Sequence, residues 1–478
     1  MMNNEMLDAR RAEANSRLDP VTKAELGQFM TPSSIAGFMA DLFEPIATKA
    51  NLLDCGAGIG SLTIPAAQRV NPTSIEVWEI DPMMRSYLRE GLQALGIPFV
   101  IHESDFVTDA VLNLHAEKGT RFTHVVLNPP YRKINSASAH RLLLRKARIE
   151  TVNLYTAFLA LAVLLAKPGG QIVAIIPRSF CNGLYYKPFR KLLLRTCSIE
   201  HLHVFESRTK AFKHDEVLQE NLILKLVKGK KQGNVTVSAS HDHTFTDTKV
   251  LRRPFADVVK PADNEAYFHV PGDEKRSATG RGFAECELRE LDVDVCTGPV
   301  VDFRLREHWL ADYQPGSVPL LYPHHFAKGQ FVFPKAHRKP NALRPGAEIS
   351  KWLMPSGWYV LIKRFSSKEE KRRVVAYLMT PDMIDSDRVG FENHLNVVHD
   401  TKHGIDAMLA KGLACYLNST RVDEAFRAFS GHTQVNATDL RNMKYPSAKT
   451  LREIGAKVEP HMSQERIDAL VESAADGS

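Results

Sequence analysis

The chain has 478 residues, of which 44% are hydrophobic, so it is long enough to form two or three globular domains with ordinary cores. A formal net charge of +7 favours an anionic partner, although many soluble proteins carry a similar excess. The six cysteines form no Cys-x-x-Cys pair, which argues against a disulfide scaffold and against a zinc site and fits a reducing cytoplasm.

The first elements lead to a glycine-rich loop. Residues 1–25 are polar and predict a frayed arm or a short helix, and Thr31-Pro32-Ser33-Ser34 reads as a capped start of a helix over 35–42. An apolar strand then ends at Asp54 and runs into Gly56, Gly58 and Gly60, where glycines let the backbone approach a ligand closely. Because an acid at Asp54 would repel a pyrophosphate, we expect a ligand that carries an ammonium group.

Further acids follow the next two strands. The strand over 74–80 closes on Glu79 and Asp81, either of which could hold ribose hydroxyls. The strand over 99–103 leads to Asp105, which could accept a hydrogen bond from an adenine amino group, and to Phe106, which could pack on the ring. Any one of these acids could equally be a helix cap or a solvated loop residue. Together they fall at the carboxyl ends of parallel strands, where ligands of open α/β sheets bind.

The next strand, residues 123–127, runs into Asn128-Pro129-Pro130-Tyr131. The prolines withhold N–H groups and end the strand with a stiff, open carbonyl edge. If the Asn128 side-chain oxygen and the Pro129 carbonyl accept hydrogen bonds from a planar amine, its nitrogen lone pair becomes nucleophilic. Tyr131 could stack on the ring of an extruded base. The structural alternative is a proline-rich turn with a packing tyrosine.

Strand and helix patterns alternate from about residue 50 to 230. They comprise a helix over 154–166, a strand over 171–177, a basic helix over 187–196, and strands over 199–205 and 221–227. This order predicts an α/β, Rossmann-like fold with a mostly parallel sheet and an antiparallel hairpin at its edge. Phe212, in a basic loop, could be a second stacking face for a base or a hydrophobic anchor of that loop. The apolar run over 154–166 is too short to cross a bilayer, so we expect no membrane association and a cytoplasmic protein.

The second half of the chain has a different pattern. Residues 231–280 are polar and interrupted by proline, and beyond them short apolar runs mix with helices, such as one over 368–378, in an α+β domain. The clusters Lys363-Arg364 and 371–373 fit a surface that contacts DNA phosphates, although a solvated helix face would explain the second cluster as well. Gln434 and Asn436 have side chains of the type that pairs with adenine, and which residues read bases stays open.

The ordered set of these motifs resembles the S-adenosylmethionine-dependent DNA adenine-N6 methyltransferases of the gamma arrangement, and residues 359–370 and 431–436 resemble modification enzymes of type II restriction systems. The resemblance implies S-adenosylmethionine as cofactor, with Thr31 and Pro32 beside its methionine part, Glu79 on its ribose and Ile80 against its adenine. It also implies a catalytic methyltransferase domain over 1–235, a linker over 236–280 and a DNA target-recognition domain over 281–478.

The expected function is therefore site-specific methylation of the N6 amine of a flipped adenine in double-stranded DNA. This would protect the DNA from a cognate restriction endonuclease, which need not touch the methyltransferase, and we expect a monomer. Two other functions stay open: methylation of a protein glutamine or an RNA amine, and DNA binding by a non-catalytic protein that keeps the fold. The long basic second domain counts against the first, and the intact strand-end residues count against the second. No metal is expected, because the pairs His201/His203 and His241/His243 lack Cys or acidic partners at ligand spacing.

Overall fold

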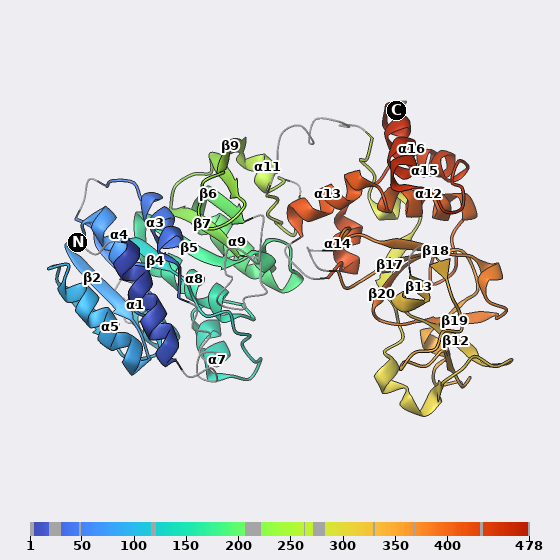
Figure 1. Ribbon diagram of the computed structural model, residues 1–478, viewed down its shortest axis with the longest axis horizontal. Coiled ribbons are helices and arrows are strands. Elements are labelled where there is room, and N and C mark those ends of the chain that lie inside the picture. The colour runs from blue at the N-terminus through green and yellow to red at the C-terminus, as the bar shows by residue number, and fades with distance from the viewer. Residues whose placement is uncertain are drawn as a thin grey trace. The chain divides into compact units, whose positions relative to one another are not determined.

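The computed structural model describes residues 4–18, 30–46, 49–115, 121–205, 221–261, 263–270, 283–327, 330–366, 370–430 and 434–476. The chain divides into two compact units, Met1–Pro271 (unit 1) and Gly272–Ser478 (unit 2), as Figure 1 shows in blue to green and in yellow to red. No helix within the described ranges has the length and apolar content that a bilayer crossing requires.

Unit 1 is built on a nine-stranded sheet. Its strands lie in the order β3-β2-β1-β4-β5-β7-β6-β8-β9. Their bounds are β1 Asn51–Asp54, β2 Ser74–Trp78, β3 Phe99–His102, β4 Phe122–Leu127, β5 Ala166–Pro177, β6 Cys197–Phe205, β7 Asn221–Lys228, β8 Asn234–Ser240 and β9 Lys249–Pro254. The pairs among β1 to β5 are parallel, whereas β7 pairs antiparallel with both β5 and β6. The chain therefore runs outward from β1 in both directions, and β1 and β4 flank the point where the strand order reverses.

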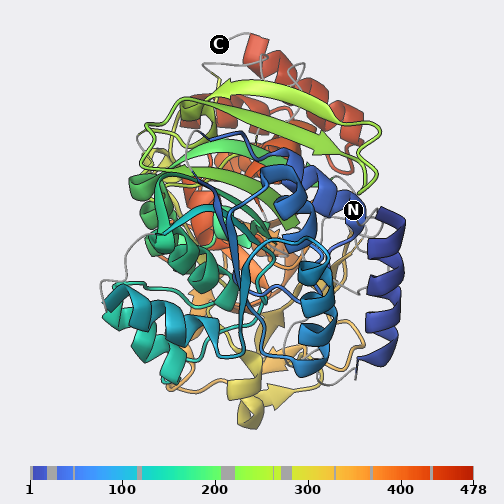
Figure 2. The same cartoon turned by 90° about the vertical axis from the view of Figure 1, so that its left-hand side faces the viewer.

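Helices cover both faces of this sheet. They are α1 Asn4–Arg17, α3 Ser33–Asp41, α4 Thr63–Val70, α5 Pro82–Gln93, α6 Phe106–His115, α7 Ala139–Lys146, α8 Leu154–Leu165 and α9 Lys187–Thr196. Alternate strand residues enter different cores: Leu52 and Val126 pack with α3, α4 and α5, whereas Leu53 and Val125 pack with α6, α8 and α9. Figure 2 shows the blue helices on one side of the strands and the green helices on the other. Burial on both faces explains why these strands are apolar throughout.

The sheet of unit 1 extends further along the chain than expected. Residues 236–280 were predicted to be a linker, but β8 pairs parallel with β6, and β9 pairs antiparallel with β8. The short helix α11, Phe255–Val258, and the fully buried Phe268 also pack on unit 1. Part of the polar stretch that suggested a linker therefore belongs to strands at the border of the sheet. The outermost strand, β9, carries Lys249, Arg252, Arg253 and Pro254.

Unit 2 is a mixed α+β unit with three small sheets. A four-stranded sheet has the order β10-β20-β17-β18 and a five-stranded sheet the order β11-β15-β12-β19-β16, while β13 pairs with β14. The strand bounds are β10 Asp294–Thr297, β11 Trp309–Leu310, β12 Val318–Leu321, β13 Phe326–Ala327, β14 Gln330–Phe331, β15 Ala342–Leu343, β16 Leu353–Pro355, β17 Tyr359–Lys363, β18 Ala376–Met379, β19 Arg388–Phe391 and β20 Leu395–His399. The helices are α12 Ala407–Leu417, α13 Thr420–Phe429, α14 Ala437–Asn442, α15 Ala448–Gly455 and α16 Gln464–Asp476.

Two features of unit 2 were not predicted. The expected helix over 368–378 is wrong, because no helix occurs in its described part and its last three residues belong to β18, which pairs with β17. Arg373 is buried instead of lying on a solvated face. Helices α12 and α15 approach so closely that a Cβ at Gly412 would lie 1.7 Å from the Leu451 carbonyl oxygen, and one at Gly455 would lie 2.0 Å from that of Met408. Only glycine fits at this crossing.

Candidate active site

A cavity of about 210 Å³ lies in unit 1 at the carboxyl ends of β1, β2 and β4 and beside the residues that follow β3. Ten of the residues predicted from the sequence line it. They are Thr31, Asp54, Gly56, Gly58, Glu79, Ile80, Asp105, Phe106, Asn128 and Pro130. The cavity therefore lies where the strand order reverses, which is the usual ligand position in a doubly wound sheet.

The glycine loop, residues 55–60, fits against the end of β2. Gly58 has φ +56°, a conformation that disfavours a side chain, and its N–H donates to Glu79 Oε2 at 2.8 Å. Gly60 has φ +89°, and a Cβ there would lie 3.1 Å from Leu88. The loop is thus held by the neighbouring strand end and brings backbone atoms to the wall of the cavity.

Asp54 is a buried acid at the end of β1. Its carboxylate accepts a hydrogen bond from the Thr63 hydroxyl at 2.7 Å. Burial raises the pKa of Asp54 to about 7, and this effect exceeds the lowering by the Thr63 and Gly56 hydrogen bonds. A carboxyl group with this pKa can release its proton when a cationic ligand binds, and the resulting carboxylate neutralises the charge of that ligand.

Glu79 and Asp81 have separate roles in the structure. Asp81 caps α5, because its side chain accepts from the N–H groups of Met83 and Met84. Glu79 lines the cavity and accepts from Asp81 N–H at 2.8 Å through Oε1. Burial raises the pKa of Glu79 above its ordinary value, against the hydrogen bonds that its carboxylate accepts. Of the two acids, Glu79 is the one that lines the cavity.

Asp105 is paired with a histidine that the sequence did not indicate. His140 Nε2 lies 3.1 Å from Asp105 Oδ1, and the same oxygen accepts from the Thr108 N–H and hydroxyl. Burial alone would raise the pKa of Asp105, but the hydrogen bonds from His140 and Thr108 outweigh burial and lower it. The hydrogen bond to Asp105 raises the pKa of His140. Since the bonds that orient this carboxylate meet at Oδ1, Oδ2 can accept a hydrogen bond from a ligand.

Asn128, at the end of β4, is held on both sides. Its Nδ2 donates to Thr31 Oγ1 at 3.1 Å, and its Oδ1 accepts from the Tyr131 hydroxyl at 2.9 Å. The Tyr131 ring packs edge-on against Tyr155, with ring centroids 6.2 Å apart. Burial raises the pKa of Tyr131 far above its ordinary value, so the hydroxyl keeps its proton and donates. The Asn128 amide, which lines the cavity, is thus held by Thr31 on one side and by Tyr131 on the other.

Other predicted residues lie outside the lining. Pro32, Pro129 and Tyr131 do not line the cavity, and Phe212 lies outside the described residues. Pro32 precedes α3 and makes no side-chain cap, and the Asp8 carboxylate of α1 accepts from the Ser33 N–H at 3.3 Å and from the Ser33 hydroxyl. The hydroxyls at this helix start were expected to cap it, and the contact with α1 has replaced that role.

Sequence reasoning missed several lining residues, among them Trp78, Arg132, His140 and Phe158. Phe106 packs between Trp78 and Phe158, at centroid distances of 5.5 and 5.0 Å. Arg132 could have been found, since it directly follows the Asn-Pro-Pro-Tyr motif. His140 gave no signal, because its contact with Asp105 joins segments 35 residues apart.

His201 and His203 contact serine hydroxyls. No cluster of three or more metal-ligating side chains occurs among the described residues. His203 is buried, with its ring nitrogens on the hydroxyls of Ser238 and Ser240, and His201 contacts Ser238. Burial lowers the pKa of both rings, to about 4 for His201 and about 3 for His203, so they remain neutral packing residues.

Comparison with known proteins extends over both units. Residues 94–212 match the family model described as Eco57I restriction-modification methylase. The chain is 49% identical to the type II methyltransferase M.BsuBI of Bacillus subtilis, over 94% of this chain and 93% of that protein. It is 40% identical to the type II methyltransferase M.PstI of Providencia stuartii, over 98% of this chain and 96% of that protein. A cryoEM structure of a DrdV–DNA complex is similar in fold, with a TM-score of 0.53 at 11% identity, over 95% of this chain and 59% of that one.

Proposed function

Because the chain belongs to the type II DNA methyltransferases of restriction-modification systems, we propose that its unit 1 cavity transfers a methyl group to the N6 amine of an adenine extruded from duplex DNA. The enzyme uses S-adenosylmethionine and acts on DNA, as its family does. The observation that carries the adenine assignment is the fixed Asn128 amide, which lines the same cavity as the glycine loop and three acids.

The donor set fits S-adenosylmethionine. Asp54 has the charge to neutralise an ammonium group, Glu79 can accept from ribose hydroxyls, and Asp105 can accept from the adenine amine through Oδ2. The half-exposed Ile80 side chain and Phe106 offer apolar contacts to the purine ring. Thr31 lines the cavity and accepts a hydrogen bond from Asn128. Thr31 and the adjacent Pro32 would lie beside the methionine part of S-adenosylmethionine. The mutual arrangement of these groups supports each role.

The protein contributes hydrogen-bond acceptors that polarise the target amine and align it with the methyl group. S-adenosylmethionine supplies a methyl group on a sulfonium, which is already electrophilic. Asn128 Oδ1, which accepts from the Tyr131 hydroxyl, is the first acceptor for a hydrogen of the target amine. The Pro129 carbonyl is the second acceptor. Two such acceptors hold the amine hydrogens out of the ring plane, which takes the nitrogen lone pair out of conjugation and directs it at the methyl group. As the N–C bond forms, the C–S bond of the sulfonium breaks, and the methylated nitrogen then releases a proton. Pro130 lines the cavity, and Tyr131 and Phe212 would stack on the extruded base.

The decisive experiment changes Asn128 to Ala. Single-turnover methyl transfer to duplex DNA should fall on the order of 100-fold or more, because one preorganised polar contact is lost, while cofactor and DNA still bind. Asn135→Ala, at an exposed position of the following connector, is the matched control and should keep the parent rate. Transfer by Asn128→Ala at the parent rate would refute the mechanism, and transfer by the parent to RNA or protein but not to DNA would refute the substrate.

The domain roles belong to the same proposal. Unit 1 is the catalytic domain and unit 2 recognises the DNA target. We infer that the enzyme works as a monomer in the cytoplasm beside a cognate restriction endonuclease, without needing to touch it. The two relatives that match nearly the whole chain, and therefore both units, are type II methyltransferases, which favours DNA over an RNA or protein substrate and a catalytic role over binding alone. The tRNA adenine-N6 methyltransferases among the relatives match 41% of this chain or less.

A further inference from the structure

Three segments of unit 2 meet at one place, and two of them are stretches that the sequence alone marked as distinctive. Arg364 N–H donates to the His394 carbonyl at 2.9 Å, and Val435 N–H donates to the Arg364 carbonyl at 2.7 Å. The segment after β17, the turn between β19 and β20, and the loop before α14 are therefore joined by backbone hydrogen bonds. We refer to Arg364, Phe365, His394 and Gln434 as the recognition patch.

The recognition patch exposes an aromatic pair. The Phe365 side chain is a large apolar group with 39% of its surface exposed, and its ring lies 4.9 Å from that of His394, centroid to centroid. The Arg364 guanidinium lies 5.6 Å from the Phe365 ring centre. Exposed aromatic and cationic side chains in contact are frequent where proteins bind nucleic acid.

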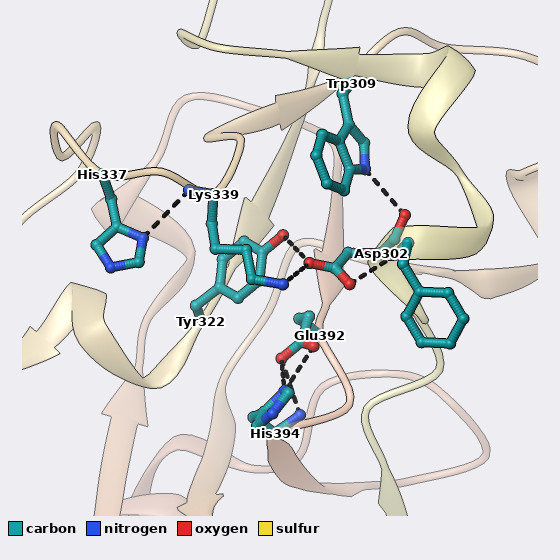
Figure 3. A network of polar contacts seen from close by, with 8 residues as sticks. Asp302, Trp309, Tyr322, His337, Lys339, Glu392 and His394 are labelled. Carbon is teal, nitrogen blue, oxygen red and sulfur yellow. Dashed lines mark hydrogen bonds and ion pairs between the residues drawn. The ribbon is translucent and has the colours of Figure 1, made fainter.

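A buried carboxylate fixes His394. Glu392 is fully buried, and its side chain accepts from the His394 N–H at 2.9 Å and contacts His394 Nδ1 at 2.6 Å. Figure 3 shows this pair beside Asp302, whose carboxylate contacts Lys339 Nζ and the Tyr322 hydroxyl. With Nδ1 committed to Glu392, Nε2 is the ring nitrogen that can meet a ligand, because the hydrogen bond at one nitrogen sets the state of the other.

Gln434 is oriented as well. Its Oε1 lies 3.5 Å from Arg364 Nη2, and Arg364 Nη1 donates to the Asn393 carbonyl at 3.0 Å. The buried Asn396 amide donates to the Val435 carbonyl at 2.7 Å and holds the loop from behind. Asn436, the other side chain of the expected pair, instead bonds to Asp439 at the start of α14. Gln434 therefore remains the candidate of the two for contact with a base.

The cations near the patch are tied to the protein. Lys363, expected to contact a phosphate, pairs with Glu370 at 2.6 Å, and the Arg364 guanidinium is held by the contacts described above. Phosphate binding needs charge and tolerates mobility, whereas the reading of base edges needs hydrogen-bonding groups in fixed positions. The fixed geometry of the patch meets the second requirement.

We propose that the recognition patch contacts base edges of the target DNA sequence, with His394 Nε2 and the Gln434 amide as the discriminating groups and Phe365 as their apolar support. The proposal rests on the proposed DNA methyltransferase function and goes beyond it, because it assigns sequence discrimination to named side chains.

The test maps methylated adenines by direct sequencing of a randomised plasmid library that was propagated with each variant. The wild-type enzyme should mark one sequence. His394→Ala and Gln434→Ala should also mark sequences that differ from it at one base pair, with discrimination reduced on the order of 10- to 100-fold. His403→Ala removes an exposed ring of unit 2 that contacts its own turn, and this control should keep the parent sequence. Glu392→Gln should relax discrimination at the same base pair as His394→Ala.

Two further measurements make the result decisive. The melting temperature and S-adenosylhomocysteine affinity of each variant should equal those of the parent, which separates lost recognition from lost folding. Unchanged specificity in both His394→Ala and Gln434→Ala would overturn the proposal. So would equally weaker binding to all DNA sequences with a smaller salt slope, because that result would identify phosphate contacts. If the wild-type enzyme marks no plasmid DNA at all, it is the proposed function that fails.

Discussion

The Tyr131 hydroxyl donates a hydrogen bond to Asn128 Oδ1. This bond connects the residue proposed to stack on the base with the residue proposed to polarise the amine. Tyr131→Phe keeps the ring and removes one hydrogen bond, which is worth about 0.5 to 1.5 kcal/mol, so single-turnover methyl transfer should slow roughly 2- to 12-fold. Tyr131→Ala also removes stacking worth about 1 to 3 kcal/mol and should be slower still. Fluorescence of 2-aminopurine at the target position reports base extrusion, which should survive only in the Phe variant. Equal rates for the two variants would contradict this division of roles.

Asp54 makes cofactor binding depend on pH. Its pKa of about 7 in the folded protein is raised by burial, and a cationic ligand binds the ionised form more tightly than the protonated form. The affinity for S-adenosylmethionine should therefore rise as pH increases from about 6 through 7 and then level off. Asp54→Asn keeps the acceptor for Thr63 and should bind more weakly, with a much flatter pH profile. Calorimetry in buffers of different ionisation enthalpy should detect proton release by the parent, and a parent affinity that falls over this range would exclude the role.

The same shift has a consequence for the stability of the protein without cofactor. An unfolded carboxyl ionises near its ordinary value of 3.8, well below the folded value of about 7. Between these two values the unfolded chain binds fewer protons, so raising the pH reduces the contribution of Asp54 to the free energy of unfolding. The increase in melting temperature caused by the cofactor should accordingly be larger at pH 7.5 than at pH 6.

Single residues differed in how far the sequence could place them. Acids at strand ends were predictable because parallel strands bring their carboxyl ends to one edge, and Asp54, Glu79 and Asp105 line one cavity. His140 was not predictable, because it lies in α7 and only tertiary packing brings this helix to Asp105. The choice between Glu79 and Asp81 also required the structure, because a strand-end acid and a helix cap look alike in a sequence.

At the scale of elements, the crossing of α12 and α15 depends on Gly412. An alanine there would drive its Cβ into the Leu451 carbonyl, so Gly412→Ala should lower the free energy of unfolding by about 1 to 3 kcal/mol, the usual cost of overpacking. Gly37→Ala is the matched control, because this helical glycine has open space where a Cβ would lie and alanine favours helix. Denaturant unfolding followed by circular dichroism measures both. Equal stability of Gly412→Ala and the parent would show that the helices separate at little cost.

The central strands and helices of unit 1 were predicted because buried parallel strands are apolar and their helices alternate with them. Strands β8 and β9 were not predicted, since the small polar residues of β8, the charged residues of β9 and the neighbouring prolines resemble those of a linker. In unit 2, residues 371–378 join a basic cluster to an apolar run, a pattern that suits an amphipathic helix. Residues from Ala376 onward form a strand because they pair with β17. This pairing joins segments that are distant in the sequence, so the local residue pattern does not predict it.

At the scale of the whole molecule, the chain divides into Met1–Pro271 and Gly272–Ser478, and this division falls within the polar stretch 231–280 that the composition marks. The chain keeps unit 1 compact through β9 and α11 before unit 2 begins. The near full-length match to type II methyltransferases covers both units, so the enzyme combines the cofactor cavity and the recognition patch in one polypeptide.

Strand β9 has a consequence for the behaviour of the protein in concentrated solution. It is the last strand in the order of the nine-stranded sheet, and a strand in that position can template the addition of another chain and so start polymerisation. Lys249, Arg252 and Arg253 would meet the same cations on a second copy, and Pro254 has no N–H to offer. The basic residues that made this strand resemble a linker would therefore oppose the addition of a second copy at this edge.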